Sequence, residues 1–299
     1  MIREATIVAA HGRHYEVEDS HGDRCQALPF GKTSTFACGD RVRIRSAAAD
    51  QARIVELIPR SSCLFRSDQW KQKLIAANAS QIVIVVASEP AFSAELVSRA
   101  LAAAENQHMR ALIVLNKNDL TANLATGRRQ LEAFATLGYR VIEMAAKQDV
   151  NQLRPMLHGQ CSVLVGQSGM GKSTLINTLV PGAGAATREI STALDSGKHT
   201  TTHATLYGID VDSTIIDSPG LQEFGLAHLT FGEIEHAFIE FRPTLGQCRF
   251  HDCRHDAEPD CAVKDLLAAG VIDRDRYDHF RTIIRQQEKG AGLAGPSSR

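Results

Sequence analysis

Two nucleotide-binding motifs occur along this 299-residue chain in an order that restricts how it can fold. The tetrapeptide Asn116–Asp119, with the sequence NKND, comes before the glycine-rich segment Gly166–Thr174, GQSGMGKST. A third motif, Asp217–Gly220, DSPG, follows both. In an ordinary GTPase domain the phosphate-binding loop comes first and the base-binding loop follows it. The chain therefore contains every part of a GTP site but reaches the parts in a permuted order.

The glycine-rich segment fits the eight-residue phosphate-loop pattern and lies between an apolar run, Cys161–Val165, and a helical pattern, Lys172–Leu179. Its glycines let backbone N–H groups surround phosphates, and the N-terminus of the helix adds partial positive charge. Lys172 is expected to reach the β- and γ-phosphates, and the Ser173 hydroxyl is expected to bind Mg²⁺. The predicted nucleotide-binding residues of this loop are Gly166, Gln167, Ser168, Gly169, Met170, Gly171, Lys172, Ser173 and Thr174.

The base-binding loop follows a second apolar run, and its chemistry predicts a preference for GTP over ATP. The Asp119 carboxylate can accept hydrogen bonds from guanine N1–H and N2–H₂ together, and adenine offers no such pair of donors. Lys117 is expected to lie over the base, and Asn116 is expected to join neighbouring loops. Ala145 and Ala146 follow the next predicted strand, and a backbone N–H there is expected to contact guanine O6.

Two further segments are predicted to act at the γ-phosphate. Asp217 follows an apolar strand, as an aspartate in the magnesium shell should, and the Gly220 amide can donate to the γ-phosphate. The segment Ser196–Thr202 lies where a switch loop should supply a threonine to Mg²⁺. Leu221 occupies the position at which Ras-like GTPases carry the glutamine that orients water. Intrinsic hydrolysis is therefore expected to be slow unless His199 or a partner completes the site.

A cluster of cysteines near the C-terminus predicts a metal centre. The pattern C-x₄-C-x-H-x₅-C contains Cys248, Cys253, His255 and Cys261, which is a full set of four ligands for tetrahedral zinc. Because no position remains for a substrate, the expected role of the zinc is structural. His251 is a competing ligand from the same segment. The total of seven cysteines suits a metal site in a reducing compartment better than a disulfide scaffold.

The chain is predicted to contain three domains. Residues 1–62 carry short alternating segments separated by turn residues, which favours an OB-like β-barrel, with a generic SH3-like barrel as the alternative. Residues 63–225 alternate buried strands with helices, as a parallel α/β GTPase domain requires. Residues 226–299 are expected to be mostly helical around the zinc, with a disordered tail from Gly290. The basic segment around Trp70 is either an RNA-stacking element or a linker.

The composition of the chain restricts the kinds of partner that it is expected to bind. Hydrophobic residues make up 43% of the chain and charged residues 22%, as in soluble globular proteins. No apolar run is long enough for a membrane helix, and the N-terminus has no signal-peptide core, so a cytoplasmic location is expected. The formal net charge of −1 argues against a DNA-binding zinc finger, and any RNA binding must come from local patches. A monomer is the default expectation.

The permuted order of the motifs, followed by the zinc pattern, resembles the RsgA (YjeQ) family of ribosome small-subunit-dependent GTPases. The resemblance covers residues 1–285. The matching pieces are Asn116–Asp119, Gly166–Thr174, Gly197–Thr202, Asp217–Gly220 and the ligands Cys248, Cys253, His255 and Cys261. It implies a circularly permuted GTPase of the bacterial cytoplasm that acts late in 30S maturation and contacts 16S rRNA. It also implies a barrel and a zinc domain that bind the subunit, and hydrolysis that the subunit stimulates.

The resemblance also assigns roles inside the predicted switch loop. It points to Thr201 as the second Mg²⁺ ligand and to His199 as the candidate catalytic histidine. Ala145 stands where the family often has serine, and the expected contact by a backbone amide is retained. Gly169 stands where potassium-activated GTPases carry asparagine, so no potassium dependence is predicted. An RNA-binding module gated by nucleotide remains as the alternative function. A phosphate-loop kinase should bind ATP, and Asp119 argues against it.

Overall fold

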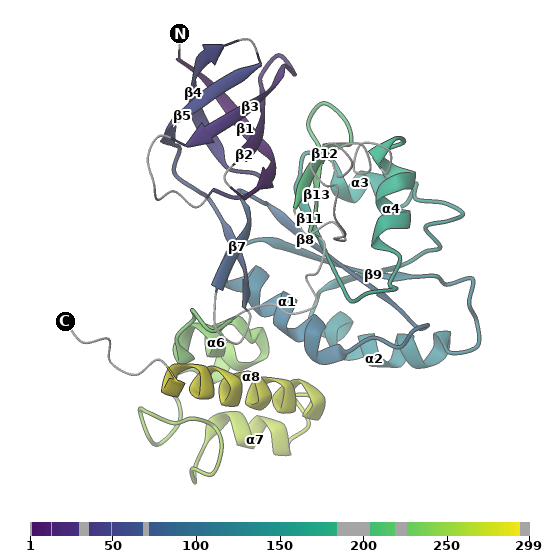
Figure 1. Cartoon of the computed structure of the whole chain (residues 1–299). Helices are drawn as coiled ribbons and strands as arrows, with labels where there is room; N and C mark the ends of the chain where they lie inside the picture. Colours follow the sequence, from purple (N-terminus) through teal and green to yellow (C-terminus); the bar gives the residue numbers. More distant parts are fainter. Residues whose placement is uncertain are drawn as a thin grey trace, which may run out of the picture.

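The computed structural model describes residues 2–12, 14–29, 36–48, 50–67, 72–183, 204–218 and 226–293. Figure 1 shows three parts: a β-barrel at the top, an α/β unit at the right, and a group of helices at the bottom. Two of the parts share one sheet of eleven strands, in the order β10-β9-β8-β11-β13-β12-β1-β2-β3-β5-β4. None of the helices in the described part of the chain combines the length and apolar character needed to span a membrane.

The N-terminal barrel closes because β1 pairs with both β2 and β4. Its strands alternate in burial, so inward residues such as Ile7, Val17, Ile44 and Ile54 form a separate core. The parallel pairing of β3 with β5 completes a closed five-stranded barrel, which confirms the OB-like fold class. The strands are β1 (Ile2–His11), β2 (His14–Asp19), β3 (Arg24–Pro29), β4 (Arg41–Ala48) and β5 (Gln51–Leu57).

A two-stranded hairpin, β6 (Cys63–Ser67) with β7 (Gln72–Ala77), follows the barrel where the sequence suggested a linker or an RNA-stacking element. The segment that leads into the hairpin is held to the barrel by the fully buried Asp40, whose carboxylate accepts hydrogen bonds from Arg60 at 2.6 and 2.8 Å. The Asn78 amide also donates to the Gly39 carbonyl at 2.9 Å. Trp70 lies outside the described residues.

The α/β unit has five adjacent parallel strands in its sheet, which confirms the predicted GTPase-type fold. Figure 1 shows α1 and α2 on one face of this sheet and α3 and α4 on the other. The strands are β8 (Gln81–Ala87), β9 (Arg110–Asn116), β10 (Arg140–Glu143), β11 (Cys161–Val165) and β13 (Thr214–Asp217). The helices are α1 (Ala94–Asn106), α2 (Leu124–Thr136), α3 (Arg154–Leu157) and α4 (Lys172–Leu179).

One further strand, β12 (Thr205–Gly208), connects the two sheets, and the sequence pattern did not reveal it. It runs antiparallel to β13 along its whole length and pairs with the barrel strand β1 at Ala9 and Thr205. The barrel is therefore continuous with the α/β sheet through backbone hydrogen bonds.

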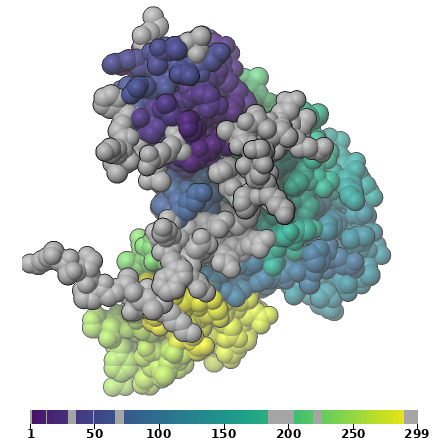
Figure 2. Space-filling view, in the orientation of Figure 1, coloured from purple at the N-terminus to yellow at the C-terminus, as the bar shows by residue number. Residues whose placement is uncertain are grey.

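The C-terminal unit packs its helices against α1, and Figure 2 shows it at the end of the molecule opposite the barrel. Its aromatic core includes Phe238, Phe241 and Phe280, all fully buried. The last helix continues to Leu293, so the tail predicted to be disordered from Gly290 is helical over its first residues. The elements are α6 (Phe231–Ala237), the 3₁₀ helix η1 (Ile239–Thr244), α7 (Ala262–Ala268) and α8 (Arg274–Leu293).

Candidate nucleotide site and metal centre

The carboxyl ends of neighbouring parallel strands bring the predicted nucleotide-binding loops to one edge of the sheet. The base motif follows β9, the phosphate loop follows β11 and Asp217 ends β13. The strand β8 lies between β9 and β11, so its own following loop, 88–93, separates the base loop from the phosphate loop. This is the edge at which open parallel α/β sheets bind ligands. The permuted order along the chain thus leaves the spatial order of the loops intact.

Asn116 joins three of these loops through its buried side chain, which is 2% exposed. Its amide nitrogen donates to the Met170 carbonyl at 2.9 Å, in the phosphate loop. Its amide oxygen accepts from the backbone N–H of Ala146 at 2.9 Å. A nearby hydroxyl, that of Thr178 in α4, also donates to the Ala146 carbonyl at 3.0 Å. The base loop, the Ala145–Ala146 loop and the phosphate loop therefore form one hydrogen-bonded frame.

The backbone of the phosphate loop requires glycine at two positions. Gly166 has φ 145°, and a Cβ there would lie 2.2 Å from the Val85 carbonyl oxygen. Gly171 has φ 93° and is the N-cap of α4, and no side chain caps that helix. The first N–H groups of α4 consequently have no side-chain cap and can serve an anion. Ser168, Gly169 and Ser173 of the loop are exposed.

Lys172 folds back over its own loop. Its ammonium donates to the carbonyls of Gly166 at 2.5 Å and Gln167 at 2.7 Å. Burial lowers the pKa of Lys172, while the nearby Asp217 acts in the opposite direction. Burial in turn raises the pKa of Asp217, and Lys172 opposes that rise. The two groups are thus half-buried near each other, Lys172 at the start of α4 and Asp217 at the end of β13, where a Mg²⁺–phosphate group would add charge between them.

The base loop presents an open carboxylate next to a constrained lysine. Lys117 has φ 60° and its ammonium donates to the Glu89 carbonyl at 2.8 Å. Asp119 is exposed at the end of the loop, so its two oxygens are accessible to a base. Ala145 and Ala146 are buried in the facing loop. This arrangement leaves the Asp119 carboxylate accessible beside a buried facing loop.

A contact that sequence reasoning missed connects the phosphate loop to α1. The Gln167 side-chain oxygen accepts the backbone N–H of Ser93 at 2.7 Å, and the Ser93 hydroxyl accepts from Leu96 as the N-cap of α1. Glutamine has no special place in the phosphate-loop pattern, so no motif could have indicated this role.

The residues predicted to act at the γ-phosphate lie mostly outside the described part of the chain. These are His199 and Thr201 of the segment Ser196–Thr202, together with Gly220 and Leu221. The adjoining Asp217 and Ser218 are described, and Ser218 is buried.

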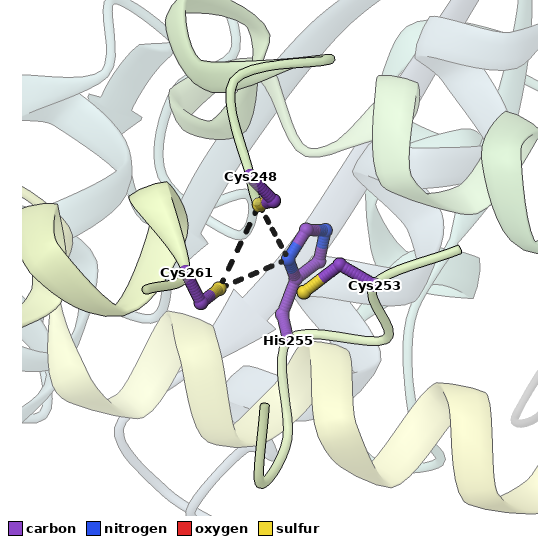
Figure 3. Close-up of side chains that lie close together, drawn as sticks. All are labelled: Cys248, Cys253, His255 and Cys261. Atoms are coloured by element: carbon purple, nitrogen blue, oxygen red, sulfur yellow. Dashed lines mark hydrogen bonds between the residues drawn. The ribbon is translucent and has the colours of Figure 1, made fainter. Parts of the chain in front are cut away.

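The metal-ligating atoms of Cys248, Cys253, His255 and Cys261 all lie within 4.8 Å of one another. Figure 3 shows the three thiols around the imidazole ring. The Sγ atoms of Cys248 and Cys261 are 3.8 Å apart, and His255 Nδ1 lies 3.6 Å and 3.3 Å from them. His251, the competing ligand, points elsewhere, because its side chain is 98% exposed.

These separations match the edges of a zinc tetrahedron. With Zn–S near ~2.3 Å and Zn–N near ~2.05 Å, tetrahedral angles place two sulfurs about 3.8 Å apart and a sulfur and a nitrogen about 3.6 Å apart. The other nitrogen of the ring, His255 Nε2, lies 2.6 Å from Glu235 Oε1. A carboxylate in this position fixes the tautomer that leaves Nδ1 free for the metal. The residues therefore fit zinc, with Glu235 as a supporting group.

The protein fold holds His255 in place from several sides. His255 has φ 57°, and its carbonyl accepts a hydrogen bond from the Tyr277 hydroxyl. The rings of Phe231, Phe241 and Phe280 surround the imidazole. In the protein without metal, burial raises the pKa of the Cys253 thiol to about 12. Glu235 lies on α6, outside the cysteine pattern, so no ligand spacing could have identified it.

Comparison with known proteins identifies relatives along nearly the whole chain. A family profile described as RsgA GTPase matches residues 57–227. A protein of Burkholderia pseudomallei named small ribosomal subunit biogenesis GTPase RsgA is 49% identical over 288 residues, which cover 95% of this chain and 92% of that protein. A protein of the same name from Paraburkholderia xenovorans is 50% identical over 290 residues, which cover 94% of this chain and 92% of that protein.

Solved structures show the same architecture. The crystal structure of YjeQ from Thermotoga maritima has a TM-score of 0.73 and 27% identity, and the match covers 99% of this chain and 100% of that one. The structure of YloQ, described as a circularly permuted GTPase, has a TM-score of 0.70 and 23% identity. The match covers 99% of this chain and 98% of that one.

Proposed function

The chain belongs to the RsgA GTPase family and is a GTP-hydrolysing enzyme, and we propose that it acts in biogenesis of the small ribosomal subunit. It acts late in 30S maturation, and the subunit stimulates its hydrolysis. Its partners are GTP or GDP and the 30S subunit with its 16S rRNA. It works as a cytoplasmic monomer that needs neither DNA nor a membrane. The names of the relatives and the extent of the matches support this proposal.

The nucleotide is held by the loops at the sheet edge. Backbone N–H groups of Gly166–Thr174 bind the phosphates, and Lys172 exchanges its carbonyl partners for the β- and γ-phosphates. Ser173 and Thr201 would hold Mg²⁺, Asp217 would contribute to its shell, and the Gly220 amide would donate to the γ-phosphate. Bound there, Mg²⁺ neutralises charge that develops on the transferred phosphoryl group. Asp119 and the backbone at Ala145 select guanine, while Ala146 donates its N–H to Asn116, which holds these loops together.

Hydrolysis depends on a group that orients the attacking water. Leu221 has no polar atom for this task. His199 is the candidate that takes the water's proton or orients it, and docking on the subunit brings it into position. This assignment accounts for a slow enzyme that a partner activates.

The other two domains bind the ribosomal subunit. Residues 1–62 form an RNA- and ribosome-binding barrel, residues 63–225 the GTPase domain, and residues 226–299 a zinc-binding helical domain. One structural Zn²⁺ per chain is held by Cys248, Cys253, His255 and Cys261, whose mutual distances carry this assignment.

The observation that supports the proposed nucleotide site is the hydrogen-bonded frame around Asn116, which joins the base loop to the phosphate loop. The test is the rate of GTP hydrolysis with and without 30S subunits, for the wild type and for His199→Ala. We expect strong stimulation of the wild type and little of the variant. His158→Ala is the matched control, because it removes an exposed histidine of the same domain that belongs to none of the predicted nucleotide motifs. No stimulation of the wild type would refute the ribosomal role and leave the GTPase activity standing.

Leu221 favours a second candidate function, in which nucleotide gates RNA binding and hydrolysis is incidental. Binding to 30S subunits should be measured with GTP, with a non-hydrolysable analogue and with GDP. If binding requires GTP while release proceeds equally from the analogue, this second function is correct.

A further inference from the structure

A single row of exposed side chains crosses four strands of the barrel. Ile2 of β1 is the register partner of Arg45 in β4, Arg45 is opposite Arg53 in β5, and Arg53 is opposite Leu28 in β3. Residues that face each other across paired strands point to the same face of a sheet. Both arginines are exposed, Ile2 is 50% exposed and Leu28 is 42% exposed. We call this set, Ile2, Arg45, Arg53 and Leu28, the arginine row.

In the neighbouring row of exposed side chains on the same barrel strands, the arginine has acidic partners. Arg43 lies between Glu4 and Glu56 in the register. Its guanidinium is 2.9 Å from Glu56 and 3.8 Å from Glu4. Arg41, farther along β4, is also paired, at 3.1 Å from Glu4. The arginines of this neighbouring part of the wall therefore have acidic partners within the barrel.

Arg45 and Arg53 have no ion pair among the described residues of the chain. The adjoining segment 30–35, FGKTST, contains no acidic residue that could serve them. Like charges directly opposite each other destabilise a sheet, and the next row shows that the barrel accommodates glutamates at such positions. The fold itself therefore gives no reason for two facing, unpaired arginines between two exposed aliphatic side chains.

We propose that the arginine row is a docking surface for the sugar–phosphate backbone of RNA, and this rests on the proposed ribosomal function. Guanidinium groups bind phosphate oxygens with two parallel hydrogen bonds, so two adjacent arginines fit consecutive phosphates of one strand. Ile2 and Leu28 give the ends of the row apolar surfaces on which a ribose or a base can pack. The mixture of bare positive charge and apolar contact suits single-stranded or looped RNA.

The position of the row also suits a large partner. Figure 1 shows β4 and β5 on the side of the barrel that points away from the α/β unit, and Figure 2 shows their surface at the outer end of the molecule. The row is thus separated from the loops that bind nucleotide. Binding there leaves the nucleotide site open.

The test measures binding of the full-length protein to intact 30S subunits and to protein-free 16S rRNA at a series of salt concentrations. Arg45→Ala/Arg53→Ala is compared with Arg41→Ala/Arg43→Ala, which removes the same charge from the paired arginines. We expect the first variant to bind both targets about tenfold more weakly or worse, because two phosphate contacts are lost. The slope of log K against log salt should fall by about 1.4 to 1.8, at roughly 0.7 to 0.9 per contact. The control should change affinity less than about twofold.

Each remaining outcome would overturn either the arginine row or the proposed function. Equal losses of affinity in the two double variants would mean that the overall positive charge of the barrel matters and not the arginine row. Wild-type affinity in Arg45→Ala/Arg53→Ala would mean that the row does not contact RNA. A loss on 30S subunits without a loss on 16S rRNA would identify an acidic protein as the partner. If the wild type fails to bind 30S subunits, the proposed function fails instead. GTP hydrolysis without subunits and the melting temperature should stay at wild-type values in both double variants, which verifies folding.

Discussion

Gly171 and Asn116 are packed so closely that a methyl group at Gly171 would lie 2.3 Å from Asn116 Nδ2. The same Nδ2 atom donates to the Met170 carbonyl at 2.9 Å, and Gly171 itself has φ 93°. The glycine is therefore needed for two reasons, its backbone conformation and the space that the asparagine amide fills. Through this contact the base loop supports the phosphate loop.

Substitution of Gly171 should separate the effect of its backbone conformation from the effect of its contact with Asn116. Gly171→Ala is expected to weaken GTP binding by about tenfold or more, because the new methyl displaces the amide and breaks its bond to Met170, a loss of roughly 1–3 kcal/mol. Gly182→Ala is the matched control, since Gly182 has φ 94° and no atom within 4 Å of a new Cβ. Titration with a fluorescent guanine nucleotide measures both. Equal effects would show that backbone strain alone matters.

Asp119 should determine which base the enzyme accepts. Asp119→Asn replaces one acceptor oxygen by an N–H₂ donor, which faces the guanine N–H donors and loses their hydrogen bonds. We expect GTP affinity to fall about 100-fold or more, and affinity for XTP, whose O2 is an acceptor, to rise. Asp149→Asn in the facing loop is the control. Competition between GTP, XTP and ATP for the site gives the readout, and an unchanged order of preference would contradict the assignment.

Glu235 should matter for zinc although it is not a ligand. Its carboxylate is 2.6 Å from His255 Nε2, so Glu235→Gln is expected to weaken zinc binding by about 10- to 100-fold. Glu233→Gln on the same helix is the control, because Glu233 only closes the N-terminal cap at Thr230. Transfer of zinc to a colorimetric chelator measures the affinity. Identical affinities in the two variants would remove Glu235 from the metal centre.

Zinc removal should change the pH dependence of the C-terminal unit, both in its direction and in the pH range where it occurs. Without metal, burial raises the pKa of the Cys253 thiol from 9.0 to about 12, so the folded unit favours the neutral thiol. This contribution to stability is fully present below pH 9 and is lost as pH rises toward 12. Zinc requires thiolates, so the loaded protein should instead gain metal affinity as pH rises from 6 to 9. Thermal melts with and without chelator test both slopes, and parallel slopes would argue against thiolate ligation.

The buried pair of Arg276 and Glu240 should be costly to break. Arg276 is 1% exposed, donates to Glu240 at 2.8 Å and lies over the rings of Phe134 and Phe238. Arg276→Met leaves an uncompensated carboxylate and should lower the free energy of unfolding by about 3–5 kcal/mol.

Two comparisons isolate the charge effect at Arg276. Arg128→Met breaks an exposed pair with Glu143 and should cost at most about 1 kcal/mol. Adding Glu240→Gln to Arg276→Met should recover most of the loss, because the unpaired charge is removed. Urea unfolding measures all three, and no recovery would assign the loss to packing.

The sequence predicted the parts of the fold in which local pattern and tertiary environment agree. The runs Ile82–Val86 and Ala111–Leu115 are continuously apolar because their strands are covered on both faces, and the loops after such strands could be located directly. The barrel strands could be predicted in the same way, because apolar and polar residues alternate along them. The zinc ligands could be predicted because their spacing within one short segment carries the chemistry.

Other features depend on partners that are distant in the sequence. Thr205–Gly208 is a short segment whose strand conformation comes from pairing with β13 and β1, so no periodicity could reveal it. The hairpin at Cys63–Ala77 carries polar residues and was interpreted as a linker or an RNA-stacking element. The contacts of Gln167 with Ser93 and of Glu235 with His255 join different elements, and only the folded chain brings them together. The roles of His199 and Thr201 stay predictions.

The closure of the barrel has a consequence for the behaviour of the protein at high concentration. An open sheet of eleven strands would offer two free edges to other molecules, and free edges template aggregation. Here β12 pairs with β1 at Thr205, and β4 pairs with β1 along the other part of that strand, which leaves β10 as the one terminal strand among the described strands of this sheet. That edge is a short strand with Arg140 and Glu143 at its ends. Excising the barrel would uncover β12, so the isolated GTPase domain should self-associate more readily than the intact chain.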